Sequence, residues 1–420
     1  MSQPLCFLDL FAGAGGLSEG FIRAGFSPVA HIESDVAACY TLRTRIARHW
    51  LYAQGYYDFY LKYLNGEVTR EALYNVLPEE QIGSVINAEI GDIQLPFIFQ
   101  KIDERLGKRK LDLIVGGPPC QAYSLVGRSR DKNRMQGDQR NYLYEYYAEF
   151  LKRYKPKYFV FENVLGLLSA KDVDGFPYFE KMRDTFLMAG YQTEYKVLSS
   201  EQYGVLQQRK RIILVGRRGR NTSFYPMPDH WNPNVNVEEV FSDLPPLQSG
   251  GGSYSPCTLK PYKGRWLYDA KIRQNNVPVT MHQARPHTEQ DKEIYRMVVE
   301  KWNQSKTRLS YSDLPERLQT HRQRSAFLDR FKVVAADLPC AHTVVAHIAR
   351  DGHYYIHPDI SQNRSITPRE AARLQTFPDD YYFESVSGVP ARTPAFRQIG
   401  NAVPVLLAQK IAEKLRKVWG

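Results

Sequence analysis

The chain has 420 residues, 43% of them hydrophobic, so it can bury a sizeable core and disorder is not the default expectation. Its formal net charge of +11 favours a polyanionic partner, nucleic acid above all, although charge alone also fits a basic soluble protein. No apolar run is long enough to span a membrane and the N-terminus lacks a signal-peptide pattern, so we expect a cytoplasmic protein.

The first motif is a strand followed by a glycine loop and a helix. Residues 5–11 predict a buried strand, residues 12–16 a glycine-rich loop and residues 17–25 a helix, which is the start of a Rossmann-like unit. A second apolar run, residues 28–32, ends in Glu33, which is placed to bind ribose hydroxyls. Because the glycines do not follow GxGxxG, they favour a nucleoside ligand without phosphate, and a purely structural turn is the alternative.

Residues 37–83 have a helical pattern rich in tyrosine, and the part from 43 to 83 predicts an insert. Gly66 would break it into a helical hairpin. Stacking of bases on the tyrosines is conceivable, but we expect a helical pair packed on the sheet. Residues 85–90 then predict a short strand, after which Asp92 could reach an amino group of the ligand.

Cys120 is the candidate nucleophile. Residues 111–117 predict a buried strand, and the Gly-Gly-Pro-Pro that ends it predicts a rigid turn before the cysteine. Such a cysteine, followed by a polar loop, suits a nucleophile, whereas a lone cysteine is more often simply buried. The five cysteines show no zinc-site or CxxC spacing, so no metal and no disulfide framework is indicated. Residues 126–140 form a basic loop that either contacts phosphates or is merely solvated.

A carboxylate and a basic run follow. Residues 158–161 predict a strand that ends in Glu162, and we expect this strand to lie beside the one that ends at Cys120. In the run QQRKR, alternation places Gln207, Arg209 and Arg211 on one face, where the arginines could bind phosphates or a base carbonyl.

The composition changes after Gly216. Residues 217–361 are rich in Pro, Gly, Asn and Ser and predict a second, irregular domain. Regular structure returns at Thr367, which predicts a helix N-cap with Glu370 completing a capping box, and another helix is expected to begin at Pro404.

The motifs FLDLFAGAGGLSEGF, GDI, GGPPCQAYS, FENV, QQRKR, RSITPREAARLQTFPDDY and QIGNAVP stand in the order found in DNA cytosine-5 methyltransferases, and the chain resembles that family from residue 7 to 409. The resemblance implies an α/β fold, a Rossmann-like S-adenosylmethionine-dependent methyltransferase sheet with a second, smaller irregular target-recognition domain. It assigns residues 1–216 to the catalytic and cofactor-binding domain, 217–361 to target recognition, and 362–420 to a segment that returns to the catalytic domain. Tyr123 stands where many members have Phe, and the insert is longer than in the smallest members.

The resemblance also implies three sets of site residues. The catalytic set is Cys120, Glu162, Arg209 and Arg211. The set expected to hold S-adenosylmethionine is Phe11, Ala12, Gly13, Gly15, Gly16, Leu17, Glu33, Asp92, Ile93, Pro118, Leu143, Asn401 and Ala402. The set expected to contact DNA is Ser124, Arg128, Arg130, Gln207 and Thr343.

The implied reaction transfers a methyl group to carbon 5 of a cytosine flipped out of double-stranded DNA. The Cys120 thiolate adds at carbon 6, Glu162 bonds the N3 edge and the exocyclic amine, Arg211 holds O2, and Arg209 supports the loop and phosphates. No metal is needed. We expect a monomer whose methylation protects host DNA, with a cognate endonuclease or phage-defence proteins as partners.

Three alternatives come from other classes. The RNA-methylating branch of the same fold carries a Cys-Phe-Thr stretch that is absent here. A catalytically silent binding module would have a damaged PCQ or ENV stretch, and both are intact. Methyltransferases that act on amino groups need a polar residue and an aromatic residue around Pro-Pro, whereas here Cys120 follows the two prolines.

Overall fold

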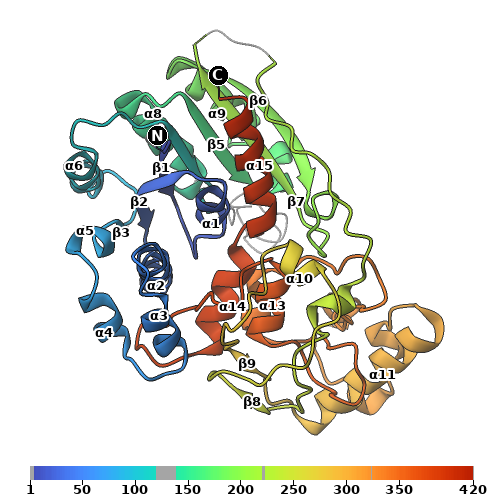
Figure 1. Ribbon diagram of the computed structural model, residues 1–420. Helices are drawn as coiled ribbons and strands as arrows, with labels where there is room; N and C mark the ends of the chain where they lie inside the picture. The colour runs from blue at the N-terminus through green and yellow to red at the C-terminus, as the bar shows by residue number, and fades with distance from the viewer. Residues whose placement is uncertain (1–3, 120–138, 220–222, 323, 420) are drawn as a thin grey trace.

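A seven-stranded sheet, with helices on both faces, forms the centre of the protein (Figure 1). The computed structural model describes residues 4–119, 139–219, 223–322 and 324–419. The strand order is β3-β2-β1-β4-β5-β7-β6; the first five strands are parallel, and β7 runs antiparallel to both β5 and β6. The strands are β1 (Cys6–Leu10), β2 (Ser27–Glu33), β3 (Val85–Asn87), β4 (Leu113–Gly116), β5 (Tyr158–Asn163), β6 (Tyr191–Ser199) and β7 (Lys210–Arg218). The predicted α/β class is thereby confirmed.

Alternation along the strands decides which helices cover which face. Phe7 of β1 packs in one hydrophobic cluster and Leu8 in another, because successive side chains of a strand point to opposite faces. Helices α1 (Gly16–Arg23) and α15 (Val405–Lys417) cover the first face. Helices α6, α8 and α9 cover the second; their bounds are Leu95–Leu106, Leu143–Tyr154 and Tyr178–Met188.

The tyrosine-rich insert forms several helices instead of one hairpin. They are α2 (Val36–Ala53), α3 (Tyr57–Leu64), α4 (Arg70–Asn75) and α5 (Glu79–Ile82). The chain breaks first at Gly55 and again at Gly66, which have φ angles of 80° and 78° that glycine adopts without strain. The strand expected over residues 85–90 is shorter than predicted and ends at Asn87.

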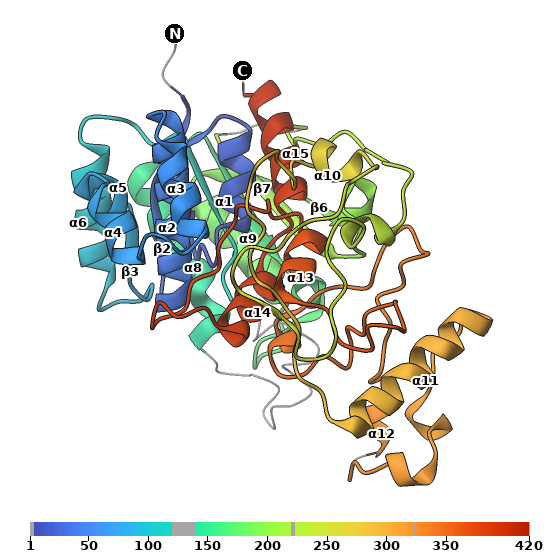
Figure 2. The ribbon, with the colours of Figure 1, turned by 60° about the horizontal axis from the view of Figure 1, so that its bottom comes forward.

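Residues 217–361 contain little regular structure, as expected. Their elements are β8 (Gly252–Ser253), α10 (Trp266–Asp269), β9 (His282–Gln283), α11 (Glu289–Ser305) and α12 (Arg324–Phe327). Part of this region, including Trp266, shares the cluster that contains α1 and α15. A separate cluster forms around α11, which projects away from the sheet with α12 in Figure 2. The domain boundaries at 217 and 361 stay a prediction.

Two helices bring the C-terminal segment back to the sheet, namely α13 (Pro368–Leu374) and α14 (Arg392–Asn401). The capping box of Thr367 and Glu370 is confirmed, and α15 begins directly after Pro404. Short 3-10 helices cover Gln139–Tyr142, Leu165–Ser169, Ser200–Gln202, Val237–Val240, Tyr311–Asp313, Glu316–Leu318 and Ala346–Ala349. Within the described ranges, none of the helices combines the length and apolar character needed to cross a bilayer.

Candidate functional site

A cavity of about 1460 Å³ opens where the parallel strands end. Phe11 follows β1, Glu33 ends β2, Asn87 ends β3, Pro118 follows β4 and Glu162 lies near the end of β5, and all five residues line the cavity. Ligands of open α/β sheets bind at this edge, where the crossover helices leave the sheet in different directions.

The glycine loop after β1 forms one wall of the cavity. Phe11, Gly13 and Gly15 have φ angles of 59°, 55° and 78°, so the loop turns sharply between strand and helix. The backbone N–H of Gly13 donates to Oε2 of Glu33 at 2.7 Å, and that of Asp35 donates to Oε1 at 2.7 Å. These two bonds orient the Glu33 carboxylate, while burial raises its pKa.

Asp9, which the sequence argument did not single out, also lines the cavity. It is 1% exposed, and its Oδ2 atom has no hydrogen-bond partner among the residues that the structure describes. Burial, with the nearby Glu33 carboxylate, raises the pKa of Asp9 well above its usual value. The sequence did contain a signal for this residue, namely an aspartate inside a predicted apolar strand. A buried carboxylate oxygen without a partner destabilises the fold unless a ligand bonds to it, so such a residue points to a binding site.

The cavity gathers most of the residues expected to hold a cofactor. Those that line it are Phe11, Ala12, Gly13, Gly16, Leu17, Glu33, Asp92, Ile93, Pro118, Leu143, Asn401 and Ala402. Gly15 is set back from the cavity, where a Cβ atom would lie 2.9 Å from the Tyr381 hydroxyl. Two buried carboxylates beside a glycine loop fit a nucleoside with ribose hydroxyls and a positive charge.

Glu162 and Arg211 form an ion pair in the same cavity. Nε of Arg211 lies 2.6 Å from Oε1 of Glu162, and the two side chains are 12% and 15% exposed. A Cβ atom at Gly117 would lie 2.6 Å from Oε2 of Glu162, so only glycine lets the turn after β4 approach this carboxylate. Together, the Glu162 carboxylate can accept hydrogen bonds from a planar polar ligand and the Arg211 guanidinium can donate hydrogen bonds to it.

The turn before the expected nucleophile lies beside this pair. Strands β4 and β5 are parallel neighbours, as the sequence predicted, and Gly116 lies opposite Phe161. Pro118 and Pro119 line the cavity, and Nδ2 of Asn163 donates to the Pro118 carbonyl at 3.4 Å. Four of the predicted site residues lie outside the described residues, namely Cys120, Ser124, Arg128 and Arg130.

Gln207 and Arg209 lie away from the cavity surface. Both are buried and face the interior instead of a phosphate surface. Gln207 accepts from the Val344 N–H at 2.8 Å and donates to the Leu374 carbonyl at 3.0 Å. Arg209 donates to the carbonyls of Val344 at 2.7 Å and Gly400 at 3.2 Å. They therefore join the irregular region to the C-terminal segment, and the expected roles of Gln207 at the DNA and of Arg209 in catalysis stay predictions.

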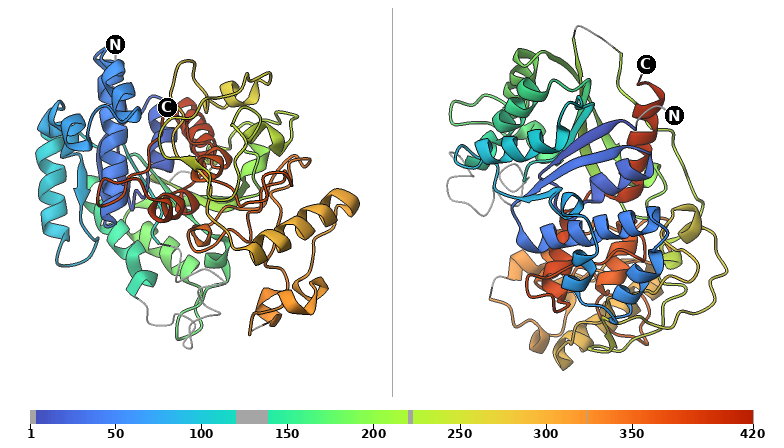
Figure 3. Two further views of the ribbon diagram at one scale, coloured as in Figure 1. Left: turned by 90° about the horizontal axis from the view of Figure 1, so that it is seen from below. Right: turned by 60° about the vertical axis from the view of Figure 1, so that its left-hand side comes forward.

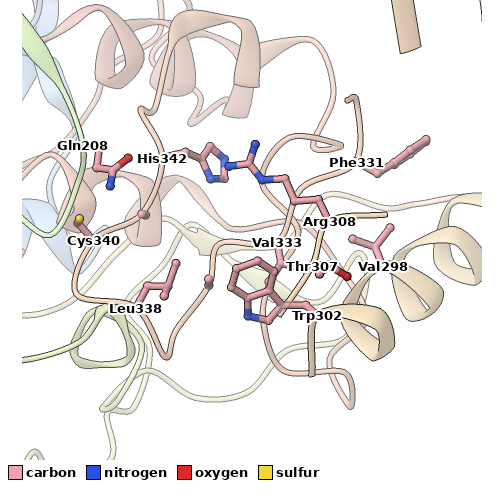
Figure 4. Close-up of a pocket in the computed structure, with 12 residues that line it drawn as sticks. Gln208, Val298, Trp302, Thr307, Arg308, Phe331, Val333, Leu338, Cys340 and His342 are labelled. Atoms are coloured by element: carbon pink, nitrogen blue, oxygen red, sulfur yellow. The ribbon is translucent and has the colours of Figure 1, made fainter. Parts of the chain in front are cut away.

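Thr343, the predicted backbone contact, is half-buried, and its hydroxyl donates to the Gln208 carbonyl. Nearby, a smaller pocket of about 170 Å³ lies between α11 and this loop (Figure 4). Its lining is Gln208, Val298, Trp302, Thr307, Arg308, Phe331, Val333, Ala335, Leu338, Cys340, Ala341 and His342. Burial lowers the pKa of His342 to about 4, so this side chain is neutral near pH 7. Among the predicted site residues that the structure describes, none lines this pocket.

Comparison with known proteins gives a consistent result. The family model of C-5 cytosine-specific DNA methylases matches residues 5–52 and 83–417. The Type II methyltransferase M.Bpa9945I of Bacillus paralicheniformis is 40% identical over 98% of each chain. M.DdeI of Desulfomicrobium norvegicum is 31% identical over 97% of this chain and 88% of its own length. Among solved structures, a prophage-encoded DNA modification methyltransferase of E. coli has a TM-score of 0.63 at 21% identity and covers 99% of each chain, a likeness of fold.

The substitution Asp9→Asn tests whether the negative charge of Asp9 destabilises the folded protein. Because the folded state raises the pKa of Asp9, folding favours the protonated acid, and the stability it contributes is lost as pH rises through the folded pKa. We expect Asp9→Asn to increase the free energy of unfolding at pH 8 by about 1 kcal/mol, with a smaller gain at pH 5. Urea unfolding at both pH values measures it, with the exposed Asp58→Asn as control. A variant less stable than wild type at pH 8 would contradict this account.

Proposed function

We propose that this chain, which belongs to the C-5 cytosine-specific DNA methylase family, methylates carbon 5 of a flipped cytosine through a covalent Cys120 adduct. Membership of the family establishes the class of reaction. The protein is a DNA (cytosine-5-)-methyltransferase, its methyl donor is S-adenosylmethionine, and it acts on double-stranded DNA. The residue roles are our proposal.

The observation that carries the proposal is that the glycine loop and the Glu162–Arg211 pair line a single cavity. S-adenosylmethionine supplies an electrophilic methyl group on a sulfonium centre when it is bound. Glu33 is oriented to bond its ribose hydroxyls, and Asp9 lines the cavity with an unpartnered Oδ2 atom whose ionised form a bound positive charge would favour. Asp92, Ile93 and Asn401 line the same cavity and complete the proposed cofactor site.

Cys120 is the proposed nucleophile because carbon 5 of cytosine is unreactive while the ring is aromatic. The thiolate sulfur forms a bond to carbon 6, and the electron pair of the 5–6 double bond makes carbon 5 nucleophilic. After methylation, the proton on carbon 5 passes to solvent, and the electron pair of that bond re-forms the 5–6 double bond as the sulfur leaves carbon 6 as a thiolate. Both carbons are inaccessible within a duplex, so the base must leave the stack.

Glu162 and Arg211 are the proposed contacts of the flipped ring. The Glu162 carboxyl faces the N3 and amino edge and stabilises charge that develops as sulfur attacks, while Arg211 donates to O2. Their 2.6 Å ion pair fixes the two groups side by side before the base arrives. Such preorganisation lowers the cost of orienting them during the reaction.

Cys120→Ser should abolish methyl transfer, because a hydroxyl does not form the adduct at neutral pH. Tritium transfer from S-adenosylmethionine to DNA measures the reaction. Cys340→Ser serves as control because Cys340 lines the smaller pocket and not the cavity. Activity near the wild-type level in Cys120→Ser would reject the assignment, as would an equal loss in a folded Cys340→Ser protein.

Glu162→Gln should leave binding of S-adenosylmethionine unchanged and slow the chemical step by about 10²–10³-fold, the range for loss of one charge-stabilising group. The amide still meets the exocyclic amine but holds no exchangeable acid for N3. Single-turnover kinetics at saturating DNA isolates this step. Unchanged rates would reduce Glu162 to a structural partner of Arg211.

Sequence discrimination is proposed to reside in residues 217–361, because Glu162 and Cys120 act on any flipped cytosine. This region is irregular, and α11 with its own hydrophobic cluster lies apart from the sheet. Loops in the major groove discriminate bases by about 1–3 kcal/mol per good bidentate contact. Ser124, Arg128, Arg130, Gln207 and Thr343 stay predicted DNA contacts.

A graft of residues 217–361 into a relative with another target should transfer this protein's target sequence. Bisulfite sequencing of DNA from a methylation-free host reads out the site. Because Gln207 and Arg209 anchor this region, both chimeras with and without these two residues should be made. An active chimera that keeps the relative's target would place recognition elsewhere in the chain.

The biological setting is proposed from the relatives. Those reported above are named Type II methyltransferases, which supports a modification enzyme of a restriction–modification system. A cognate endonuclease or phage-defence proteins, a monomeric state and a cytoplasmic location stay predictions.

A further inference from the structure

We propose that the tyrosine-rich insert is a clamp that positions the cofactor cavity, through α3 and residues 380–384. The inference rests on the proposed cofactor site. The family model matches residues 5–52 and 83–417, so it includes residues 380–384 but leaves out residues 53–82, which contain α3. Figure 3 (right) shows the insert against the C-terminal segment.

Three tyrosines on one face of α3 bind residues 380–384. They are spaced by three residues, which places them on neighbouring turns. The hydroxyl of Tyr57 donates to Oδ2 of Asp380 at 3.0 Å, that of Tyr60 to the Asp380 carbonyl at 2.7 Å, and that of Tyr63 to Oε1 of Glu384 at 2.5 Å. Tyr60 and Tyr63 are buried, so these bonds are protected from water.

The adjacent helix α2 holds the same two acids. Arg45 and Arg48 donate to the two carboxylate oxygens of Asp380 at 2.8 and 2.7 Å. Thr44 donates to Oε1 of Glu384 at 2.6 Å. The buried charge of Asp380 is therefore paired on both oxygens, and its place relative to α2 and α3 is fixed.

The other side of the segment reaches the cofactor cavity. The hydroxyl of Tyr381 donates to the Ala14 carbonyl in the glycine loop at 2.5 Å. The side chain of Gln398, which lines the cavity, donates to the Glu384 carbonyl at 2.9 Å and accepts from Thr41 at 2.6 Å. Residues 380–384 thus connect α3 to two walls of the cavity, the glycine loop and α14.

These contacts argue against base stacking as the role of the α3 tyrosines. Tyr60 and Tyr63 are buried with their hydroxyls bonded. The exposed tyrosines of the insert, Tyr52 and Tyr56, lie before α3 and make none of the bonds to the segment given above. The observed contacts instead support a role for these tyrosines in positioning residues 380–384.

The test is binding of S-adenosylmethionine to full-length Tyr60→Phe/Tyr63→Phe, measured by calorimetry. Each substitution keeps the ring and removes only the hydroxyl. We expect the dissociation constant to rise about 5- to 50-fold, in the range of coupling between linked sites. The turnover number at saturating cofactor and the affinity for DNA should stay within about 2-fold of wild type, because the cavity edge at Glu162 is not held by these bonds.

Tyr191→Phe is the matched control. It removes a buried tyrosine hydroxyl that donates to the Pro156 carbonyl at 2.8 Å, in β6 at the opposite edge of the sheet. Unchanged cofactor affinity in the double variant would overturn the clamp, and so would an equal loss in Tyr191→Phe, which would indicate general destabilisation. Wild-type protein that fails to bind S-adenosylmethionine would instead overturn the proposed cofactor site, and the clamp with it.

Amide hydrogen exchange gives a second readout on the same proteins. Loss of the clamp should increase exchange in the glycine loop, residues 12–17, and in residues 398–403 of the cavity wall. Exchange in β4 and β5 should stay at the wild-type level, since these central strands do not depend on α3. Increased exchange throughout the sheet would contradict a local positioning role.

Discussion

The cavity depends on the pairing of β1 with β2 on one side and with β4 on the other. The chain leaves β1 toward α1 on one face, and the helices that connect the strands beyond β4 lie on the other face. The loops therefore diverge at this point and leave space at the carboxyl ends of the strands. Glu33, the turn at Pro118 and Glu162 end up around one space although they are far apart in sequence.

The edge of the sheet that borders the cavity also carries buried charged groups that do not stabilise the fold. Asp9 is buried without a partner for Oδ2, and Glu33 is close enough to raise its pKa further. A protein selected only for stability would replace such an aspartate with an apolar residue. The Glu162–Arg211 pair differs, because each charge is compensated by the other and both are partly solvated. The uncompensated carboxylate is thus found where a cationic ligand is expected.

Local sequence predicted the parts of the site that lie directly after strands. The glycine loop, Glu33 and Glu162 follow apolar runs, and the periodicity of those runs locates the strand ends. Alternation correctly put Gln207 and Arg209 on one face, since both are buried while Gln208 and Lys210 are exposed, but it did not show what covers that face. Their partners, Val344 and Gly400, are more than 130 residues away, and spacing does not show which distant segment covers a strand.

The insert was predicted as helical, but its function depends on contacts that no local pattern specifies. Tyrosine at every third position fits both an exposed stacking face and a buried one, and only the segment at Asp380 decides between them. Asp9 was overlooked for the opposite reason: its neighbours in the strand were read as a uniform apolar run, although one carboxylate interrupts it.

Tyr381 and Ala14, which form one hydrogen bond in the wall of the cavity, are 367 residues apart. A contact of this separation forms only when the intervening chain is folded, because closing such a loop costs entropy that local contacts must first offset. The shape of the cofactor site is therefore a property of the whole chain, whereas the Glu162–Arg211 pair needs only the adjacent strands β5 and β7. The two halves of the cavity therefore differ in how strongly they depend on the C-terminal segment. Affinity for the cofactor, which binds in the half that this segment supports, measures whether the segment is correctly packed.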